Sequence, residues 1–135
     1  MVDAEREALT TRRNFYGVLR VYEEDKGEES HRRKLYNGQI NHGLQLLNPS
    51  QKGRIVSYYS AHSGLGIAFR KHPKRLHPEK YNPSGQTSHL RVGVIGLGIG
   101  VVASWGEAGD AFRFYEINPE VVRIADEFFS VLKES

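Results

Sequence analysis

Apolar and aromatic residues in the first half of the chain fall into short runs separated by polar turns. Residues 14–25, NFYGVLRVYEED, are rich in β-branched and aromatic side chains, which predicts a strand with Phe15, Val18 and Val21 in the core. The next polar stretch, KGEES, is typical of a turn, and residues 33–48 predict a hairpin with a tight turn at Asn37-Gly38. Residues 55–59 predict a third short strand, so this half is expected to be rich in β-structure.

The second half alternates between strand and helix patterns. Residues 90–95 form a short apolar run typical of a buried parallel strand, and a glycine-rich turn then leads into a helix predicted at 99–107. Residues 112–117 predict the next strand, and a second helix follows with Asn118 as its N-cap, Pro119 in the first position and Glu120 near its positive end. Its apolar face is expected to comprise Val121, Ile124, Ala125, Phe128 and Leu132.

The two halves are joined by a stretch with weaker signals. Residues 64–72 predict a short helix, and residues 72–85 hold three prolines and several charges, which favours a loop. We therefore expect a tail at 1–12, a small β-domain at 13–62, a helix and linker at 63–88, and a partial Rossmann-like, nucleoside-binding domain at 89–135.

Composition narrows the class of protein. The 135 residues are enough for about one domain, and 39% hydrophobic with 26% charged residues is ordinary for a soluble globular protein. A net charge of +3 gives little support to nucleic-acid binding, and the absence of cysteine excludes disulfides and thiolate chemistry. No apolar run approaches the roughly 20 residues that span a bilayer, and the first residues lack the apolar core of a secretory signal, so a cytoplasmic protein is expected.

The glycine turn carries the strongest functional signal. Gly96, Gly98 and Gly100 follow a predicted strand, where glycine permits a positive φ and lets a ligand approach the backbone. Glu116 ends the next strand, where a carboxylate can accept hydrogen bonds from both hydroxyls of a ribose. The dinucleotide pattern G-x-G-x-x-G/A fails because position 101 is Val101, whereas G-x-G-x-G is similar to the turn that binds S-adenosylmethionine in class I methyltransferases and aminopropyltransferases.

Several motifs together resemble the spermidine synthase-like proteins, and most closely the branch that is often fused to membrane segments. They are RNFYGVLRV, LYNGQINHGLQ, SYYSAHSGLGIAF and VGVIGLGIGVVASW followed by FRFYEINPEVV, and they extend over residues 13–132. The resemblance implies a small N-terminal β-domain followed by a truncated Rossmann-like βαβα unit of the methyltransferase type. It also implies transfer of an aminopropyl group from decarboxylated S-adenosylmethionine to a polyamine.

Residue by residue, the resemblance gives Gly96, Gly98 and Gly100 to the nucleoside turn and Glu116 to the ribose hydroxyls. Tyr58 falls at the tyrosine of the family's Tyr-His-Glu motif.

The chain departs from this motif at the next two positions. Tyr59 and Ser60 replace the His and Glu, which puts ordinary polyamine recognition in doubt.

The family's Asp-Gly-x-x-Gln motif is only partly matched. Asn37-Gly38 stands in place of Asp-Gly, and either Asn41 or Gln45 takes the place of Gln. His42 and His62 flank these motifs and are candidates for lining a polar cleft, whereas none of the six histidines has a metal-ligand spacing. We therefore expect no metal and include Gln45 and Tyr58 among the cofactor-binding residues.

The function expected from this resemblance is the nucleoside half of a site for decarboxylated S-adenosylmethionine, S-adenosylmethionine or methylthioadenosine. The family's catalytic Asp has no counterpart by motif, so the chain resembles the front part of a longer transferase and is expected to be inactive alone. Methyl transfer and non-catalytic nucleoside binding or assembly are the alternatives. The expected partners are a polyamine or nucleoside, the rest of such a protein, or a second copy that contacts residues 90–95 or the apolar face of 121–132.

Overall fold

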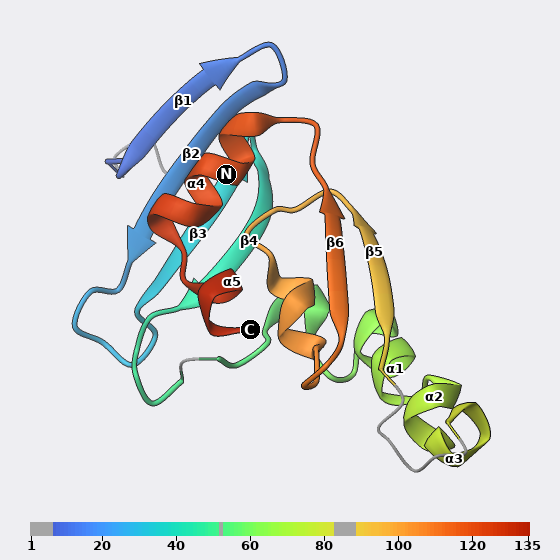
Figure 1. Ribbon diagram of the computed structural model, residues 1–135. Helices are drawn as coiled ribbons and strands as arrows, with labels where there is room; N and C mark the ends of the chain where they lie inside the picture. Colours follow the sequence, from blue (N-terminus) through green and yellow to red (C-terminus); the bar gives the residue numbers. More distant parts are fainter. Residues whose placement is uncertain (1–6, 52, 83–88) are drawn as a thin grey trace.

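The computed structural model describes residues 7–51, 53–82 and 89–135, which form two separate sheets and several short helices (Figure 1). One sheet has four antiparallel strands and comes from the first half of the chain. The other has two parallel strands and comes from the second half. The predicted α+β content is therefore present, but its arrangement differs from the expected one.

The four-stranded sheet is a meander of consecutive hairpins. Its strands are β1 (Thr10–Asn14), β2 (Gly17–Glu24), β3 (Arg32–Asn37) and β4 (Ile40–Leu46), and they lie in sequence order. The predicted hairpin turn after Asn37 is confirmed, with Gly38 at a φ of +58°. A bulge between Leu35 and Tyr36 shifts the register of β3 against β4.

Three predictions for this half need correction. Phe15 does not lie in the core, because the chain turns there between β1 and β2 and leaves its side chain 95% exposed. Residues 55–59 do not form a strand; Ser57–Tyr59 is a short 3-10 helix, η1. The region predicted as a tail at 1–12 contributes the first residues of β1, while residues 1–6 lie outside the described part. Val21, in contrast, is fully buried as predicted.

Three short helices lead from η1 to the second sheet. The predicted helix is confirmed as α1 (Gly64–Arg70), which Ser63 caps by accepting a hydrogen bond from the Gly66 N–H. The stretch predicted as a loop instead contains α2 (Pro73–Leu76) and α3 (Pro78–Tyr81). Each of these begins with a proline, whose fixed φ suits the first position of a helix. The last part of that stretch, from residue 83, lies outside the described residues.

The second sheet consists of β5 (Arg91–Ile95) and β6 (Ala111–Tyr115), paired in parallel from Arg91 opposite Ala111 to Ile95 opposite Tyr115. The connection between them is not the predicted α-helix at 99–107 but a 3-10 helix, η2 (Val101–Trp105), which begins after Gly100 in the left-handed conformation. On the face covered by α1 and η2, Phe69 stacks between Trp105 and Phe112, with ring centroids 6.2 and 5.9 Å away.

The second predicted helix is confirmed as α4 (Pro119–Phe128), with the Asn118 side chain accepting a hydrogen bond from the Glu120 N–H. It lies against the four-stranded sheet (Figure 1), and a short helix, α5 (Val131–Glu134), follows it. The predicted apolar face is too long, because Leu132 lies on α5 instead of α4 and is 40% exposed. The resulting core joins β2, β3, the glycine turn and α4, and its members are Leu19, Val21, Leu35, Ile99, Val101, Val121, Ile124 and Phe129.

This packing contradicts the predicted Rossmann-like βαβα unit. Such a unit needs helices that cover its own parallel strands. Here the first connection is a single short 3-10 helix, and α4 buries Val121 and Ile124 against the antiparallel sheet. The reason is that the apolar face of α4 packs against Leu19, Val21 and Leu35 of that sheet.

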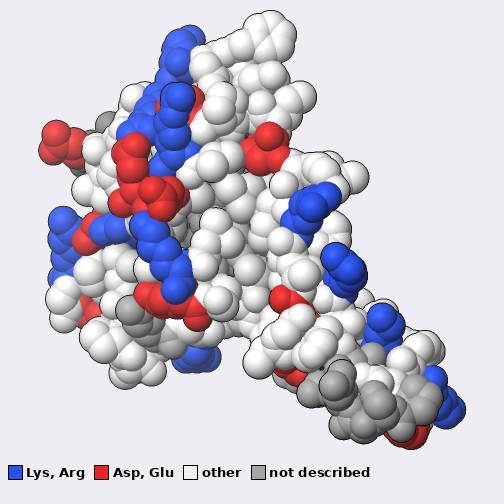
Figure 2. All heavy atoms as spheres, viewed as in Figure 1, with Lys and Arg blue, Asp and Glu red and all other residues white. Residues whose placement is uncertain are grey.

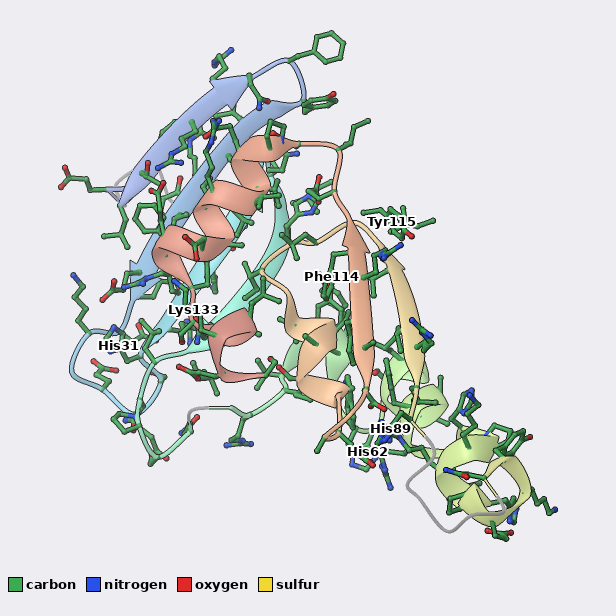
Figure 3. The ribbon with its side chains drawn as sticks, in the orientation of Figure 1. His31, His62, His89, Phe114, Tyr115 and Lys133 are labelled. Carbon is green, nitrogen blue, oxygen red and sulfur yellow. The ribbon has the colours of Figure 1, made fainter. Side chains whose placement is uncertain are left out.

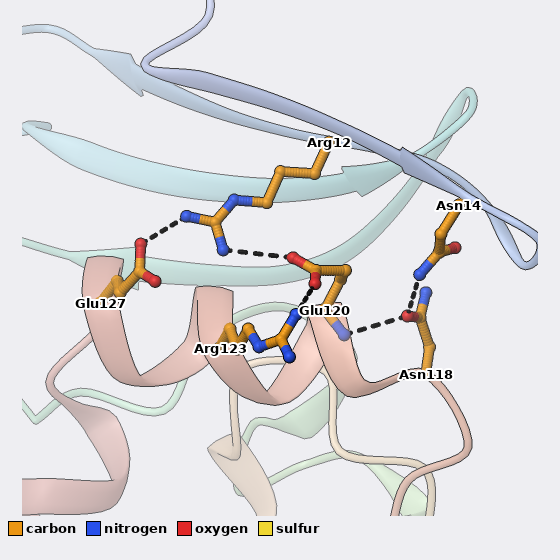
Figure 4. Close-up of polar contacts among 6 residues, drawn as sticks. All are labelled: Arg12, Asn14, Asn118, Glu120, Arg123 and Glu127. Carbon is orange, nitrogen blue, oxygen red and sulfur yellow. Dashed lines mark hydrogen bonds and ion pairs between the residues drawn. The ribbon is translucent and has the colours of Figure 1, made fainter.

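Polar contacts hold α4 against β1 (Figure 4). Arg12 on β1 forms ion pairs with both Glu120 and Glu127, which lie on one face of α4. Glu120 also forms an ion pair with Arg123. The Asn14 Nδ2 group donates to Asn118 Oδ1 at 2.6 Å. On the same side of the molecule, basic and acidic side chains are interleaved over β1 and α4, whereas the region over β5 and β6 is mostly uncharged with isolated basic groups (Figure 2).

Candidate nucleoside site

The glycine turn and Glu116 lie at neighbouring points because β5 and β6 run in parallel. Gly96 directly follows β5 and Glu116 directly follows β6, so both come from the carboxyl ends of paired strands. The Gly96 N–H donates to the carbonyl of Tyr115 at 2.8 Å, which extends the pairing into the turn. Carboxyl ends of parallel strands are common positions for ligand sites.

A hollow of about 410 Å³ opens beside this turn. Of the six residues predicted to bind a cofactor, it brings together Tyr58, Gly96 and Gly98. The other lining residues come from β4, η1, α1, β5, the glycine turn and η2; they are His42, Tyr59, Leu65, Val94, Ile95, Leu97 and Val102. The hollow is therefore mainly apolar, with two tyrosines and one histidine as its polar groups.

The three glycines differ in what surrounds them, although all have a positive φ of 87°, 56° and 84° in chain order. A Cβ on Gly96 would meet nothing within 4 Å, so this position is open to a ligand. A Cβ on Gly98 would lie 2.6 Å from the His42 carbonyl oxygen, and one on Gly100 would overlap the Leu132 side chain. Gly98 and Gly100 thus allow the turn to pack against β4 and α5, and Gly100 does not line the hollow.

Glu116 holds the glycine turn in place. Its Oε2 atom accepts a hydrogen bond from the Leu97 N–H at 2.8 Å, and its Oε1 atom accepts one from the Asn118 N–H at 2.9 Å. A carboxylate has about four lone-pair positions, so each oxygen retains capacity for a further donor. Glu116 is half-buried. It is not among the residues that line the hollow, but it accepts a hydrogen bond from Leu97, which does line it.

Gln45 is placed away from this site, contrary to the prediction. Its buried side chain donates from Nε2 to Ser130 Oγ and accepts at Oε1 from the Ser130 N–H at 3.1 Å. These contacts connect β4 to the segment between α4 and α5. The alternative, Asn41, accepts a hydrogen bond from the Gly43 N–H at 2.9 Å and is also absent from the lining.

The two tyrosines form one aromatic wall of the hollow. The ring centroids of Tyr58 and Tyr59 are 4.4 Å apart, and Tyr58 is 57% exposed. Burial, together with the neighbouring Tyr58 hydroxyl, raises the pKa of Tyr59, so this phenol stays neutral at physiological pH. The Tyr59 carbonyl accepts a hydrogen bond from the Trp105 indole at 3.0 Å, which fixes η1 against η2.

The two histidines predicted to line a polar cleft lie in different parts of the structure. His42 lines the hollow, whereas His62 lies near the amino-terminal ends of β5 and β6 together with His89, opposite the end that carries Tyr115 (Figure 3). Sequence reasoning missed Tyr59 as a site residue because it was considered only as a departure from the family motif. It also missed the apolar lining by Leu65 and Val102, for which a single sequence holds no signal.

Other site classes find no support in the described residues. Within residues 7–51, 53–82 and 89–135, no group of three His, Cys, Asp or Glu side chains is positioned to hold a metal ion. None of the described helices is both long and apolar enough to cross a membrane.

In comparisons with known proteins, no family model matches the chain, and neither a curated protein nor a solved structure gives a significant match.

Proposed function

We propose that this chain binds the nucleoside part of a sulfonium or thioether nucleoside: S-adenosylmethionine, its decarboxylated form or methylthioadenosine. The observation that carries this proposal is the hollow at the carboxyl ends of β5 and β6, with Gly96 open to it and Glu116 beside it. The resemblance to spermidine synthase-like proteins, based on the same glycines and the same glutamate, points to the same class of ligand.

The hollow has the chemistry that such a ligand requires. Tyr58 and Tyr59 offer aromatic faces for a purine, whose stacking on an aromatic ring contributes about 1–3 kcal/mol. The missing side chain at Gly96 lets a ribose approach the backbone. The remaining lone pairs of Glu116 are acceptors for the ribose hydroxyls.

The lining favours binding over group transfer. Aminopropyl transfer to a polyamine, which the resemblance suggests, and methyl transfer, its alternative, both need a positioned base when the attacking atom carries a proton. Among the described residues that line the hollow, the titratable side chains are His42, Tyr58 and Tyr59. A histidine can act as a base, but none of these described lining residues is a carboxylate that could orient its ring. We therefore favour a non-catalytic nucleoside-binding role for this chain, with transfer as the second candidate.

Calorimetric titration with methylthioadenosine, S-adenosylmethionine and NAD tests this proposal. The sulfur nucleosides are expected to bind more tightly than NAD, and Tyr58→Ala is expected to weaken binding roughly tenfold, since one stacked base contributes about 1–3 kcal/mol. Tyr81→Ala is the matched control, because Tyr81 is 52% exposed on α3 and does not line the hollow. Tighter binding of NAD, or equal losses in the two variants, would refute the proposal.

Glu116 is tested by two substitutions because it also supports the fold. Glu116→Ala removes the acceptor for Leu97 and Asn118, so weaker binding would be accompanied by lower stability. Glu116→Gln keeps one acceptor oxygen and is expected to lose less stability while still losing about 1.5–3 kcal/mol of binding from the charged acceptor. Unchanged affinity in a folded Glu116→Gln protein would remove Glu116 from the proposed site.

A further inference from the structure

The outer edge of β5 has no strand partner among the described residues. Of the strands that the structure describes, β5 bonds only to β6, and the carbonyl of Leu90 and the N–H of Gly96 both point toward that neighbour. Backbone groups alternate in direction along a strand, so the N–H and C=O groups of Arg91, Gly93 and Ile95 point away from β6. Such a row of unpaired groups is a template for pairing with another strand.

Apolar surface adjoins this edge on both faces of the sheet. On the face away from α1, Ile95 is 95% exposed and Tyr115 is 56% exposed. On the opposite face, an apolar groove of about 290 Å³ runs beside β5, where Phe69 and Val92 are among its walls. Parallel strands normally have both faces covered, so this pair of strands presents an unusual amount of uncovered apolar surface.

We propose that the β5 edge is a homodimer interface, in which β5 pairs antiparallel with β5 of a second copy about a two-fold axis at Gly93. The sequence around this glycine reads the same in both directions, Val92-Gly93-Val94. With Gly93 opposite its own counterpart, each outward N–H of one strand meets a carbonyl of the other. An isologous contact of this kind needs a self-complementary patch, which this strand provides.

Charge and shape also suit a second copy. The register places Arg91 across from Ile95 of the partner, so the aliphatic stem of the arginine covers the exposed isoleucine. The two Arg91 side chains are then four residues apart along the strands, about 14 Å at 3.4 Å per residue. That separation exceeds the Debye length of about 8 Å at physiological ionic strength, so their repulsion is screened.

In the same register, Val94 of the second copy fills the groove on the α1 face of the sheet. Val94 of one copy lies opposite Val92 of the other and points to the face that carries Phe69 and Phe112. It therefore enters the apolar groove between β5 and α1. The two α1 helices lie at opposite ends of the joined strands, because each is next to the amino-terminal half of its own β5.

Cysteine cross-linking tests the axis, since the chain has no cysteine of its own. Gly93→Cys should fold, because a Cβ there meets only the Tyr115 ring at 3.9 Å. Directly opposed residues in a hydrogen-bonded antiparallel pair have Cα atoms about 5.5 Å apart, which is within the range for a disulfide. Under mild oxidation we expect Gly93→Cys to form covalent dimers roughly tenfold faster or more than Phe15→Cys, an exposed control on the β1–β2 turn.

The register is tested by mixing two variants. Arg91→Cys with Ile95→Cys should cross-link as a mixed dimer, whereas either variant alone should not. Cross-linking of Arg91→Cys alone, or a Gly93→Cys rate no higher than that of Phe15→Cys, would overturn the proposed pairing.

Sedimentation equilibrium provides the non-covalent test. The native chain should dimerise with rising concentration, and Gly93→Pro should remain a monomer, because the lost N–H points outward and is not used by β6. Phe15→Asp should dimerise like the native chain. A native monomer at all concentrations, or a dimer that persists in a folded Gly93→Pro protein, would refute the proposal. Val94 and Ile95 also line the hollow, so both tests are made without nucleoside, and their outcomes do not depend on whether the hollow binds one.

Discussion

Alanine at Gly98 and at Gly96 should have different consequences, although both glycines have a positive φ. Left-handed backbone costs a residue with a Cβ roughly 1–2 kcal/mol, so both substitutions carry this loss. At Gly98 the new Cβ would also lie 2.6 Å from the His42 carbonyl oxygen, which is backbone of β4 and cannot rotate away. Overpacking of this kind typically adds about 1–3 kcal/mol.

The sum predicts a free energy of unfolding lowered by about 1–2 kcal/mol in Gly96→Ala and by about 2–5 kcal/mol in Gly98→Ala. At roughly 4 °C per kcal/mol for a domain of this size, the melting temperatures of the two variants should differ by several degrees. Thermal unfolding followed by circular dichroism, with urea unfolding as a second measurement, gives both quantities.

Ligand binding should show the opposite order. The new methyl group in Gly96→Ala projects into the open space of the hollow, so affinity for methylthioadenosine should fall even where the protein is fully folded. The methyl group in Gly98→Ala projects toward β4, so its effect on affinity should be smaller than its effect on stability. Equal melting temperatures, or a greater loss of affinity in folded Gly98→Ala, would refute the assignment of Gly96 to the ligand and Gly98 to packing.

Three further outcomes are expected. Burial alone would raise the pKa of Glu23, but hydrogen bonds from Arg33 and His31 lower this pKa to about 2. The stabilising contribution of the Glu23 carboxylate is therefore complete above its ordinary pKa of 4.5 and is lost as the pH falls toward 2. Glu23→Gln should therefore lose up to about 3 kcal/mol at neutral pH and show a flatter acid-unfolding profile; an unchanged profile would contradict this. Asn118→Ala removes the α4 cap and the bond from Asn14, which should lower stability by about 2 kcal/mol in urea unfolding, and a loss below a few tenths would be inconsistent with the observed contacts. The purified chain should show no aminopropyl transfer from decarboxylated S-adenosylmethionine to putrescine in a chromatographic assay, and turnover would favour the transferase candidate.

Local signals in the sequence predicted several elements well. The apolar run before the glycines gave β5, and the sequence from Asn118 to Glu120 placed the start of α4 because capping depends on neighbouring residues alone. The same is true of the turn after Asn37. The positive φ of Gly96 likewise follows from glycine at a strand-to-turn junction.

The errors concern tertiary structure. The side on which α4 packs cannot be read from its own apolar face, which would fit either sheet, and the structure places it on Leu19, Val21 and Leu35. Phe15 looked like a core residue because aromatic side chains favour strands, yet the tight β1–β2 connection turns it outward.

The candidate site was predicted only in part for the same reason. Gly96, Gly98 and Tyr58 converge as expected, but Gln45 is bound to Ser130, a contact across 85 residues of sequence that no local pattern indicates.

The most direct test of the nucleoside site is amide-resonance mapping by NMR during titration with methylthioadenosine. The account predicts saturable shifts of the Gly96 and Leu97 amides and of the residues around Tyr58 and Tyr59, because these surround the hollow. The amides of β1, which lies away from the site, should not move. Absence of any saturable shift, or shifts concentrated on β1, β2 and β3, would contradict the account.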